Sequence, residues 1–398
     1  VYKRQGVYGP GQSNYSIGGS SGLENSYLID GVNVTDSGYG GVGTFTNVFG
    51  SLGTGVTTDF LEEVQVKTGG FEAEWGQALG GVVNSVVKSG GNQFTGALKL
   101  FAQPGSLEGG RKLVELPTGA SGFLRPTEYE YYDVGLHMGG PIVKDKFFWF
   151  AAYNPVRTTT TRQAQNTTNP LGGIGDYPDS KLYPSYPSTK DVDRDSDNYA
   201  AKLSWYMTPN HRLELTAFGD PSDGVGRDGT TAATLALPTE GPDGQMGTAD
   251  DGLFNPEGWD ANGFQSNIDW GADQQALKWE GSFGANNFIT AQVSHKKNEF
   301  TETPVVDNYL YRDRRLLFEW LFGGTNLDFG GNLNSGGVGF QGPNTDETYE
   351  YSVKMTTIAG NHEFRYGGAY LDVEYMQPSV YSGPQFTFPF PVNDFQTG

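Results

Sequence analysis

Apolar and polar residues alternate along nine segments of the chain, each about ten residues long. In 197–207, for example, Leu203 and Trp205 fall on one face, and Lys202 and Ser204 fall on the other. A period of two places successive side chains on opposite faces of a strand, so each segment is predicted to be a strand with one apolar face. The nine segments are 93–103, 130–139, 146–156, 197–207, 211–220, 273–283, 287–299, 348–358 and 362–375.

The connections between these segments alternate in length as strictly as the side chains do. Tight turns at 140–145, 208–210, 284–286 and 359–361 alternate with long connections at 104–129, 157–196, 221–272 and 300–347. Neighbouring strands joined in this way run antiparallel, with every short turn at one end. Transmembrane β-barrels have this arrangement, with short periplasmic turns and long extracellular loops. The alternative is a soluble, aromatic-rich β-protein that binds glycans and buries its apolar faces against a second sheet.

Composition narrows the class further. Aromatic residues make up 14% of the 398 residues, there are 59 glycines, and mean hydropathy is −0.48. The longest apolar run, Phe147 to Tyr153, is far shorter than the roughly 18 residues of a membrane helix, so a membrane-spanning form must be a closed barrel. A net charge of −20 argues against nucleic-acid binding, and the absence of cysteine excludes disulfides and thiolate sites.

The stretch before the first alternating segment has a different character. Residues 61–68 alternate like a half-buried strand, 71–79 contain helix formers with early acidic residues, and 82–87 are β-branched. Glycine pairs separate these three pieces and permit sharp reversals. The sequence therefore predicts a small α+β element, strand, short helix and strand, ahead of the large antiparallel sheet.

Three long stretches resemble TonB-dependent outer-membrane receptors, in particular their Oar-like branch. These are NSYLIDGVNV (25–34), EVQVKTGGFEAEWGQALGGVVNSVVKSGGN (63–92) and GGPIVKDKFFWFAAYNPVR (139–157). The first two are similar to the family's plug domain, and the third is similar to a periplasmic turn and strand of its barrel. The resemblance implies a plug over 6–92 and the first part of a transmembrane barrel over 93–398, with nine strands of about 22.

The same resemblance implies a function and partners. A receptor of this kind resides in the bacterial outer membrane, contacts its lipid, and takes up a ligand past a plug in the barrel lumen. An inner-membrane protein of the TonB type supplies the energy by pulling an N-terminal segment that is expected to be absent here. An adhesion or protein-docking barrel without transport is the alternative, although such a barrel has no use for a separate folded element in its lumen.

Both ends of the chain are expected to be artificial. Val1 to Gln5 (VYKRQ) matches one reading frame of a sequencing-transposon end, so 1–5 is interpreted as an assembly scar. The alternative interpretation is a basic N-terminal strand. The chain stops at Gly398 without any terminating pattern.

Candidate ligand contacts are aromatic residues in the segments expected to face outward from the cell. Stacking on such rings suits an oligosaccharide or a peptide, but the same rings also serve to pack loops together. The candidates are Tyr39, Phe45 and Phe49 in the plug insert 36–58, and Trp259 and Trp270 in the third long connection.

Two acidic clusters are candidate calcium sites. Glycine turns bring Asp243, Asp250 and Asp251 together, although a solvated turn also explains them. The run DVDRDSD (191–197) has a carboxylate at every second residue but lacks the glycine and distal glutamate of a calcium loop. Structural calcium at the first cluster is the one cofactor that the sequence suggests.

No enzymatic activity is expected. The four histidines are scattered at His137, His211, His295 and His362, without metal-ligand spacing. The chain has no nucleophile elbow in a strand-turn-helix context, and the glycines at 38–43 precede no predicted helix that would bind phosphate.

Overall fold

The computed structural model describes most of the two sheets and part of their connections. The described residues are 16–46, 49–53, 56–70, 78–107, 126–163, 189–228, 237–239, 252–254, 265–305, 307, 310–313, 333–336, 338–378 and 380–383. The proposed scar at 1–5 and most of the helix predicted at 71–79 lie outside them. Within the described part, no helix is long and apolar enough to cross a membrane.

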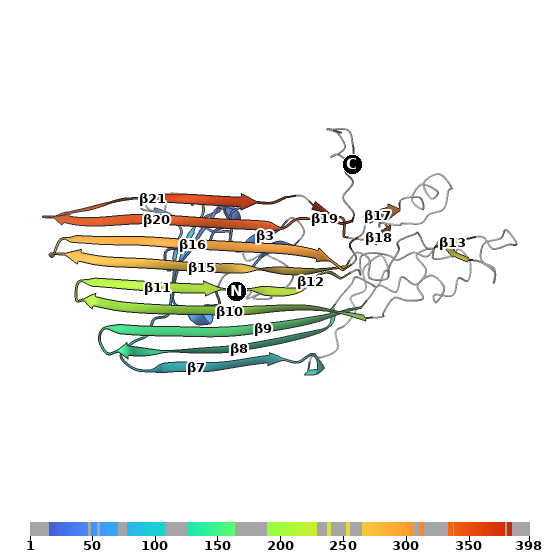
Figure 1. The fold of residues 1–398 in the computed structure, drawn as a ribbon, viewed down its shortest axis with the longest axis horizontal. Coiled ribbons are helices and arrows are strands. Elements are labelled where there is room, and N and C mark those ends of the chain that lie inside the picture. Colours follow the sequence, from blue (N-terminus) through green and yellow to red (C-terminus); the bar gives the residue numbers. More distant parts are fainter. Residues whose placement is uncertain are drawn as a thin grey trace, which may run out of the picture.

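One antiparallel sheet, here called the wall sheet, contains all nine predicted strands in sequence order (Figure 1). Its strands are β7 (Thr95–Gln103), β8 (Pro126–Val143), β9 (Phe147–Gln163), β10 (Thr189–Thr208), β11 (His211–Gly219), β12 (Ser222–Asp228), β15 (Gln265–Phe283), β16 (Asn287–Pro304), β20 (Asn344–Ala359) and β21 (His362–Met376). All tight turns lie at one end of the sheet and all long connections at the other. The antiparallel, up-and-down order is therefore confirmed.

Strands β11 and β12 form one interrupted strand, because both pair with β10 on one side and β15 on the other. Asp220 and Pro221 separate them, and proline has no N–H to donate to the ladder. Asp220 Oδ1 instead accepts a hydrogen bond from the Ala272 N–H at 2.9 Å. The strand predicted at 211–220 therefore continues to Asp228.

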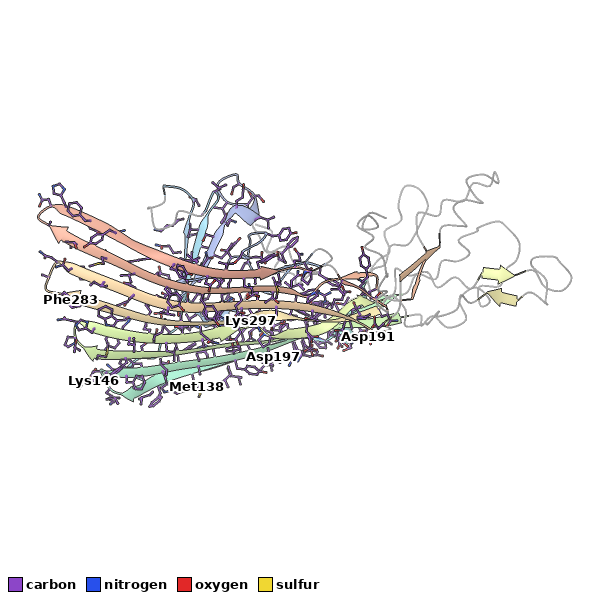
Figure 2. All side chains as sticks on the ribbon, turned by 45° about the horizontal axis from the view of Figure 1, so that its top comes forward. Met138, Lys146, Asp191, Asp197, Phe283 and Lys297 are labelled. Carbon is purple, nitrogen blue, oxygen red and sulfur yellow. The ribbon has the colours of Figure 1, made fainter. Side chains whose placement is uncertain are left out.

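The two faces of the wall sheet differ as the alternation predicts. Leu203, Trp205 and Leu277 are exposed on the outward face, and their neighbours Lys202 and Ser204 are buried on the inward face. The outward apolar residues contact no second sheet among the described residues. Figure 2 shows Phe283 and Lys146 at the turn end of the curved sheet and Asp191 at the loop end.

A second, four-stranded sheet lies on the inward face of the wall sheet (Figure 2) and is here called the plug sheet. Its strands are β1 (Ser26–Ile29), β2 (Val32–Asn33), β5 (Leu61–Lys67) and β6 (Val82–Val87), in the order β2-β1-β6-β5. β1 and β6 are parallel, and the other two pairings are antiparallel. The short hairpin of β3 (Thr44–Thr46) and β4 (Gly50–Leu52) extends from it. "Plug element" below means the described residues of 16–87.

The remaining elements are short. The 3-10 helices are η1 (Gly22–Glu24), η2 (Thr58–Phe60) and η4 (Gly105–Leu107). At the loop end, β13 (Leu237–Thr239) pairs with β14 (Gly252–Phe254), β17 (Leu310–Asp313) with β18 (Leu333–Gly336), and β19 (Phe340–Gln341) with β22 (Val380–Tyr381).

One apolar core is shared between the plug element and the wall sheet. Val32, Phe60 and Val87 of the plug element pack in the same cluster as Phe150 and Phe218 of the wall. The wall also contributes small side chains to this cluster, namely Ala152, Ala200 and Ala276. Because alanine occupies little volume, the plug element approaches the wall closely at these positions.

The connection from β6 to β7 is clamped to the first tight turn. Asn92 Nδ2 donates to Asp145 Oδ1 at 2.6 Å, and the Asp145 N–H donates to Asn92 Oδ1 at 2.8 Å. A Cβ on Gly90 would lie 2.2 Å from the carbonyl oxygen of Trp149, so only glycine permits this approach.

Candidate functional site

One almost fully buried contact between plug element and wall is an ion pair. Lys202 on β10 lies 3.1 Å from Asp30 Oδ2, and both side chains are only 3% exposed. Lys202 Nζ also donates to the Val87 carbonyl at 3.1 Å, and Thr216 Oγ1 donates to Asp30 Oδ2 at 3.1 Å. Wall strands β10 and β11 thus hold one plug carboxylate from two sides.

The turn between β1 and β2 aims Asp30 at the wall. Asp30 and Gly31 have φ values of 50° and 83°, a left-handed conformation that aspartate tolerates better than most residues and that glycine adopts freely. The Val87 N–H donates to Asp30 Oδ1 at 3.1 Å, which fixes the side chain against β6. The Ile-Asp-Gly of the plug motif is therefore both a tight turn and a contact point.

Glu214 on β11 neutralises the wall's other inward cations near Asp30. Its Oε2 lies 3.0 Å from Lys278 Nζ and 2.7 Å from Arg212 Nη2, and its Oε1 lies 3.9 Å from Lys202 Nζ. Including Glu280, which pairs with Arg212 and Lys278, the network contains three cations and three carboxylates. One of those three carboxylates, Asp30, comes from the plug element, so the wall part alone carries one excess positive charge.

A second polar contact lies nearer the loop end. Lys296 Nζ on β16 donates to the Thr35 carbonyl at 2.7 Å and to Ser37 Oγ at 3.0 Å. It also pairs with Asp346 Oδ2 on β20 at 2.8 Å, and that oxygen accepts the Ser37 N–H at 2.9 Å. Lys296 and Asp346 are almost fully buried by these contacts.

Asp36 shapes the plug loop that makes this contact. Its carboxylate accepts N–H groups from Gly38, Tyr39 and Phe45 at 3.0, 2.8 and 3.2 Å. Burial raises the pKa of Asp36, and Asp346 raises it further, while the three N–H donors act in the opposite direction. The loop then reaches β20, where Asn344 Nδ2 donates to the Phe45 carbonyl at 2.6 Å.

A third contact involves the first wall strand. Lys99 on β7 lies 2.6 Å from Asp59 Oδ2 of the plug element and 3.6 Å from Asp133 Oδ2 on β8. Its side chain is 49% exposed, so solvent screens this pair more than the pair at Lys202.

Four of the five aromatic ligand candidates lie within the described residues, and they divide into two pairs. Tyr39 and Phe45 stack with ring centroids 4.0 Å apart, and Tyr39 is 43% exposed. Phe49 and Trp270 are buried together in a cluster with Phe300, so in this structure they pack plug element against wall. Arg194 lies over both rings, at 5.9 and 5.8 Å from their centroids. Trp259 lies outside the described residues.

The calcium candidates Asp243, Asp250 and Asp251 lie between β13 and β14, outside the described residues, and remain a prediction. Within the described part, no group of three acidic or histidine side chains is placed to hold a metal ion. Asp193 and Asp191 in the DVDRDSD run accept hydrogen bonds from Thr159 and Thr161 at 2.7 and 2.6 Å, and Asp197 pairs with Arg157. These carboxylates lie within strand β10, which begins earlier than predicted, and they have partners on β9.

Comparisons with known proteins agree with this architecture. No family model matches the chain. The TonB-dependent transporter Oar of Myxococcus xanthus is 29% identical over 242 residues, which cover 58% of this chain and 22% of that protein. The crystal structure of the outer membrane transporter YddB from Escherichia coli matches with a TM-score of 0.59 and 16% identity, over 89% of this chain and 41% of that chain. The FrpB iron transporter from Neisseria meningitidis matches at a TM-score of 0.47 and 8% identity, over 91% and 54%.

The matches to Oar and YddB indicate the class of protein. The fold is that of an outer-membrane β-barrel with a plug; the alternating pattern predicted the barrel strands, and the resemblance implied the plug. The resemblance to TonB-dependent outer-membrane receptors of the Oar-like branch, and with it the outer-membrane localisation, is confirmed, and the chain is a relative of the Oar transporter. It spans 22% of that relative's length. The Oar relative is a transporter by name.

Proposed function

We propose that this chain is part of a transporter that takes up a ligand across the bacterial outer membrane, with the plug element gating the passage. The observation that supports it most directly is the Lys202–Asp30 pair, which seats a separately folded element on the inward face of the wall sheet. An adhesion or docking barrel, the alternative from the sequence, has no use for a gate that is fastened in this way.

Gated uptake needs an outside energy source, because the outer membrane holds no nucleotide and no maintained ion gradient. A TonB-type protein of the inner membrane is the proposed partner, in line with the name of the Oar relative. The proposed ligand is an oligosaccharide or a peptide, since the exposed Tyr39–Phe45 stack offers ring faces near the loop end. Outer-membrane lipid is the proposed partner of the outward apolar face.

Deleting the plug element from the complete protein tests the gate. Liposomes containing the deletion variant are expected to swell in sucrose several times faster than liposomes containing the intact protein. Heat-modifiable migration on gels shows whether the barrel still folds. Equal swelling rates with a folded barrel would reject the plug as a gate.

An uptake assay distinguishes the transport function from the adhesion alternative. Cells carrying the protein are offered a fluorescent maltooligosaccharide and a fluorescent oligopeptide, with and without a protonophore that collapses the inner-membrane gradient. Transport predicts protonophore-sensitive accumulation of at least one probe inside the outer membrane. Surface binding that is indifferent to the protonophore, without accumulation of either probe, favours the adhesion barrel.

A further inference from the structure

Three inward lysines of the wall sheet, Lys99, Lys202 and Lys296, share one arrangement. Each contacts the plug element: Lys99 through Asp59, Lys202 through Asp30, and Lys296 through Thr35 and Ser37. Each also has a wall carboxylate within 4 Å on the next strand of the sheet. These carboxylates are Asp133 at 3.6 Å, Glu214 at 3.9 Å and Asp346 at 2.8 Å, respectively.

The position of the wall carboxylate is the same in all three cases. Lys99 is paired in register with Gly135, Lys202 with Thr216, and Lys296 with Thr348. The carboxylate is always the residue two positions before that register partner, at 133, 214 and 346. Diagonal neighbours two residues apart lie on the same face of a sheet, within reach of long side chains.

This arrangement bears on what happens to the wall when the plug element moves. Lys202 and Lys296 are only 3% and 2% exposed. A buried ammonium group that loses its partner is strongly destabilising, which would oppose any displacement of the plug element. A carboxylate already within 4 Å on the same wall removes that obstacle, because a long, flexible lysine reaches it by a change of rotamer.

We propose that, during gating, two of these wall lysines exchange a plug carboxylate for a wall carboxylate and the third keeps the wall carboxylate that it already binds. With the plug element in place, Lys202 binds Asp30, and when the plug element leaves, Lys202 closes on Glu214. Lys99 exchanges Asp59 for Asp133 in the same way, and Lys296 keeps Asp346 while releasing Thr35 and Ser37. The purpose of the exchange rests on the proposed gating function, but the exchange itself is measurable without transport.

If the exchange occurs, the two carboxylates around Lys202 affect opening of the plug element in opposite directions. Asp30 stabilises only the closed state, so Asp30→Asn increases opening of the plug element. Glu214 is most important in the open state, so Glu214→Gln decreases opening, because Lys202 then has no replacement partner. If Glu214 merely supported the closed structure, both substitutions would increase opening.

Opening is measured by chemical modification of a single cysteine. The chain has no cysteine, and Ser85 on β6 of the plug sheet is buried, so Ser85→Cys gives a reporter of closely similar size. The complete protein carrying this reporter is placed in outer-membrane vesicles and treated with a maleimide, whose reaction rate follows the open population. Asp30→Asn is expected to raise the rate about tenfold or more, the ratio for loss of a hydrogen-bonded charge pair. Glu214→Gln is expected to lower it at least about threefold.

The Lys99 contact provides an independent pair of variants. Asp59→Asn is expected to raise the rate, and Asp133→Asn to lower it, both by smaller factors because Lys99 is half exposed. Lys297→Gln is the matched control, since it removes a lysine on the outward face that pairs with Glu299. Heat-modifiable migration verifies folding of every variant. The exchange is rejected if Glu214→Gln and Asp133→Asn raise the rate or leave it unchanged, whether or not the protein transports any probe.

Discussion

Lys202 and Leu203 are neighbours on β10, yet their side chains meet opposite surroundings. Lys202 is almost fully buried between Asp30, Glu214 and the Val87 carbonyl, whereas Leu203 is 37% exposed on the outward face. Side chains on the outward face of a membrane barrel meet lipid, which accommodates apolar side chains of many shapes. Side chains on the inward face each have particular partners at fixed distances. Substitutions on the two faces should therefore destabilise the protein for different reasons, and only an inward substitution should be compensated by a second substitution at its partner.

The largest expected effect follows removal of the inward charge. Lys202→Met leaves Asp30 buried beside Glu214 without its cation, which costs about 3 to 5 kcal/mol in the stability of the closed plug. Urea titration of the plug element in detergent, followed by near-ultraviolet circular dichroism, measures the loss. The double variant Asp30→Asn/Lys202→Met removes both charges and should regain at least half of it. A double variant no better than Lys202→Met would show that charge pairing is not the main contribution.

On the outward face, a charge in the apolar belt should be somewhat less damaging. Leu277→Lys exchanges an exposed apolar side chain for a cation on the outward face, at a cost of up to about 2 to 4 kcal/mol, the range for the bilayer midplane. Unfolding in lipid vesicles, followed by loss of heat-modifiable migration, reports it. Gln275→Lys, on the same face beside Asp273 and two residues closer to the loop end, is the control at about 0 to 1 kcal/mol. Equal losses for both would contradict the placement of the apolar belt.

A smaller inward effect tests whether single hydrogen bonds matter at the plug contact. Thr216→Val keeps the shape of the side chain but deletes the hydroxyl that donates to Asp30, at a cost of about 1.5 kcal/mol. In an Asp30→Asn background the same change should cost less than half as much. Additive losses in this double-mutant cycle would mean that Thr216 acts independently of Asp30.

The smallest expected effect is a pH dependence of the plug loop. Because the folded pKa of Asp36 is raised above its ordinary value of 3.8, the folded state holds more protons than the unfolded state between the two pKa values. Its contribution to plug stability therefore increases as pH falls through the folded pKa towards 3.8 and is lost again as pH rises. Comparing urea midpoints of the wild type and Asp36→Asn from pH 7 to pH 4 isolates this contribution. A contribution of the opposite sign would contradict the burial of this carboxylate.

Alternation alone was enough to predict the wall sheet, because apolar residues at every second position form its outward face and the polar residues between them form its inward face. The strands extend further at the loop end than predicted. There the outward residues turn polar, as at Asp191 and Asp193, and hydroxyls on β9 pair with them. Beyond the apolar belt, both faces of a strand are polar, so a period of two no longer distinguishes strand from loop.

The plug contacts were only half predictable. Alternation places Lys99, Lys202, Lys278 and Lys354 on the face opposite the apolar residues of their strands, where a plug would lie, and the first two of these lysines contact the plug element. Lys278 pairs with wall carboxylates instead, and Lys354 is exposed, eight residues along β20 from the contact at Asp346. Lys296 was not predicted as a plug contact, although it lies two residues from the buried Ser294 and Asn298 and therefore on the same inward face of the strand. The partners Asp30 and Asp59 depend on long-range packing that no local pattern encodes.

Aromatic content was a weaker guide than alternation. Phe49 and Trp270 are buried with Phe300 across the plug and wall contact, which is the packing role given above as the alternative for such rings, and their role as ligand contacts stays a prediction. The exposed Tyr39 retains the predicted accessibility. Ring chemistry is identical in the two cases, and only the position of the opposite surface distinguishes them.

The reciprocal hydrogen bonds between Asn92 and Asp145 have a mechanical consequence. They fasten the chain between β6 and β7 to the wall within a few residues of the plug sheet, at the end where the tight turns lie. A domain anchored at one point rotates about that point, and the parts farthest from the anchor move furthest. Pulling on the N-terminal side would then move β1 and β2 further from the wall than the residues next to Asn92.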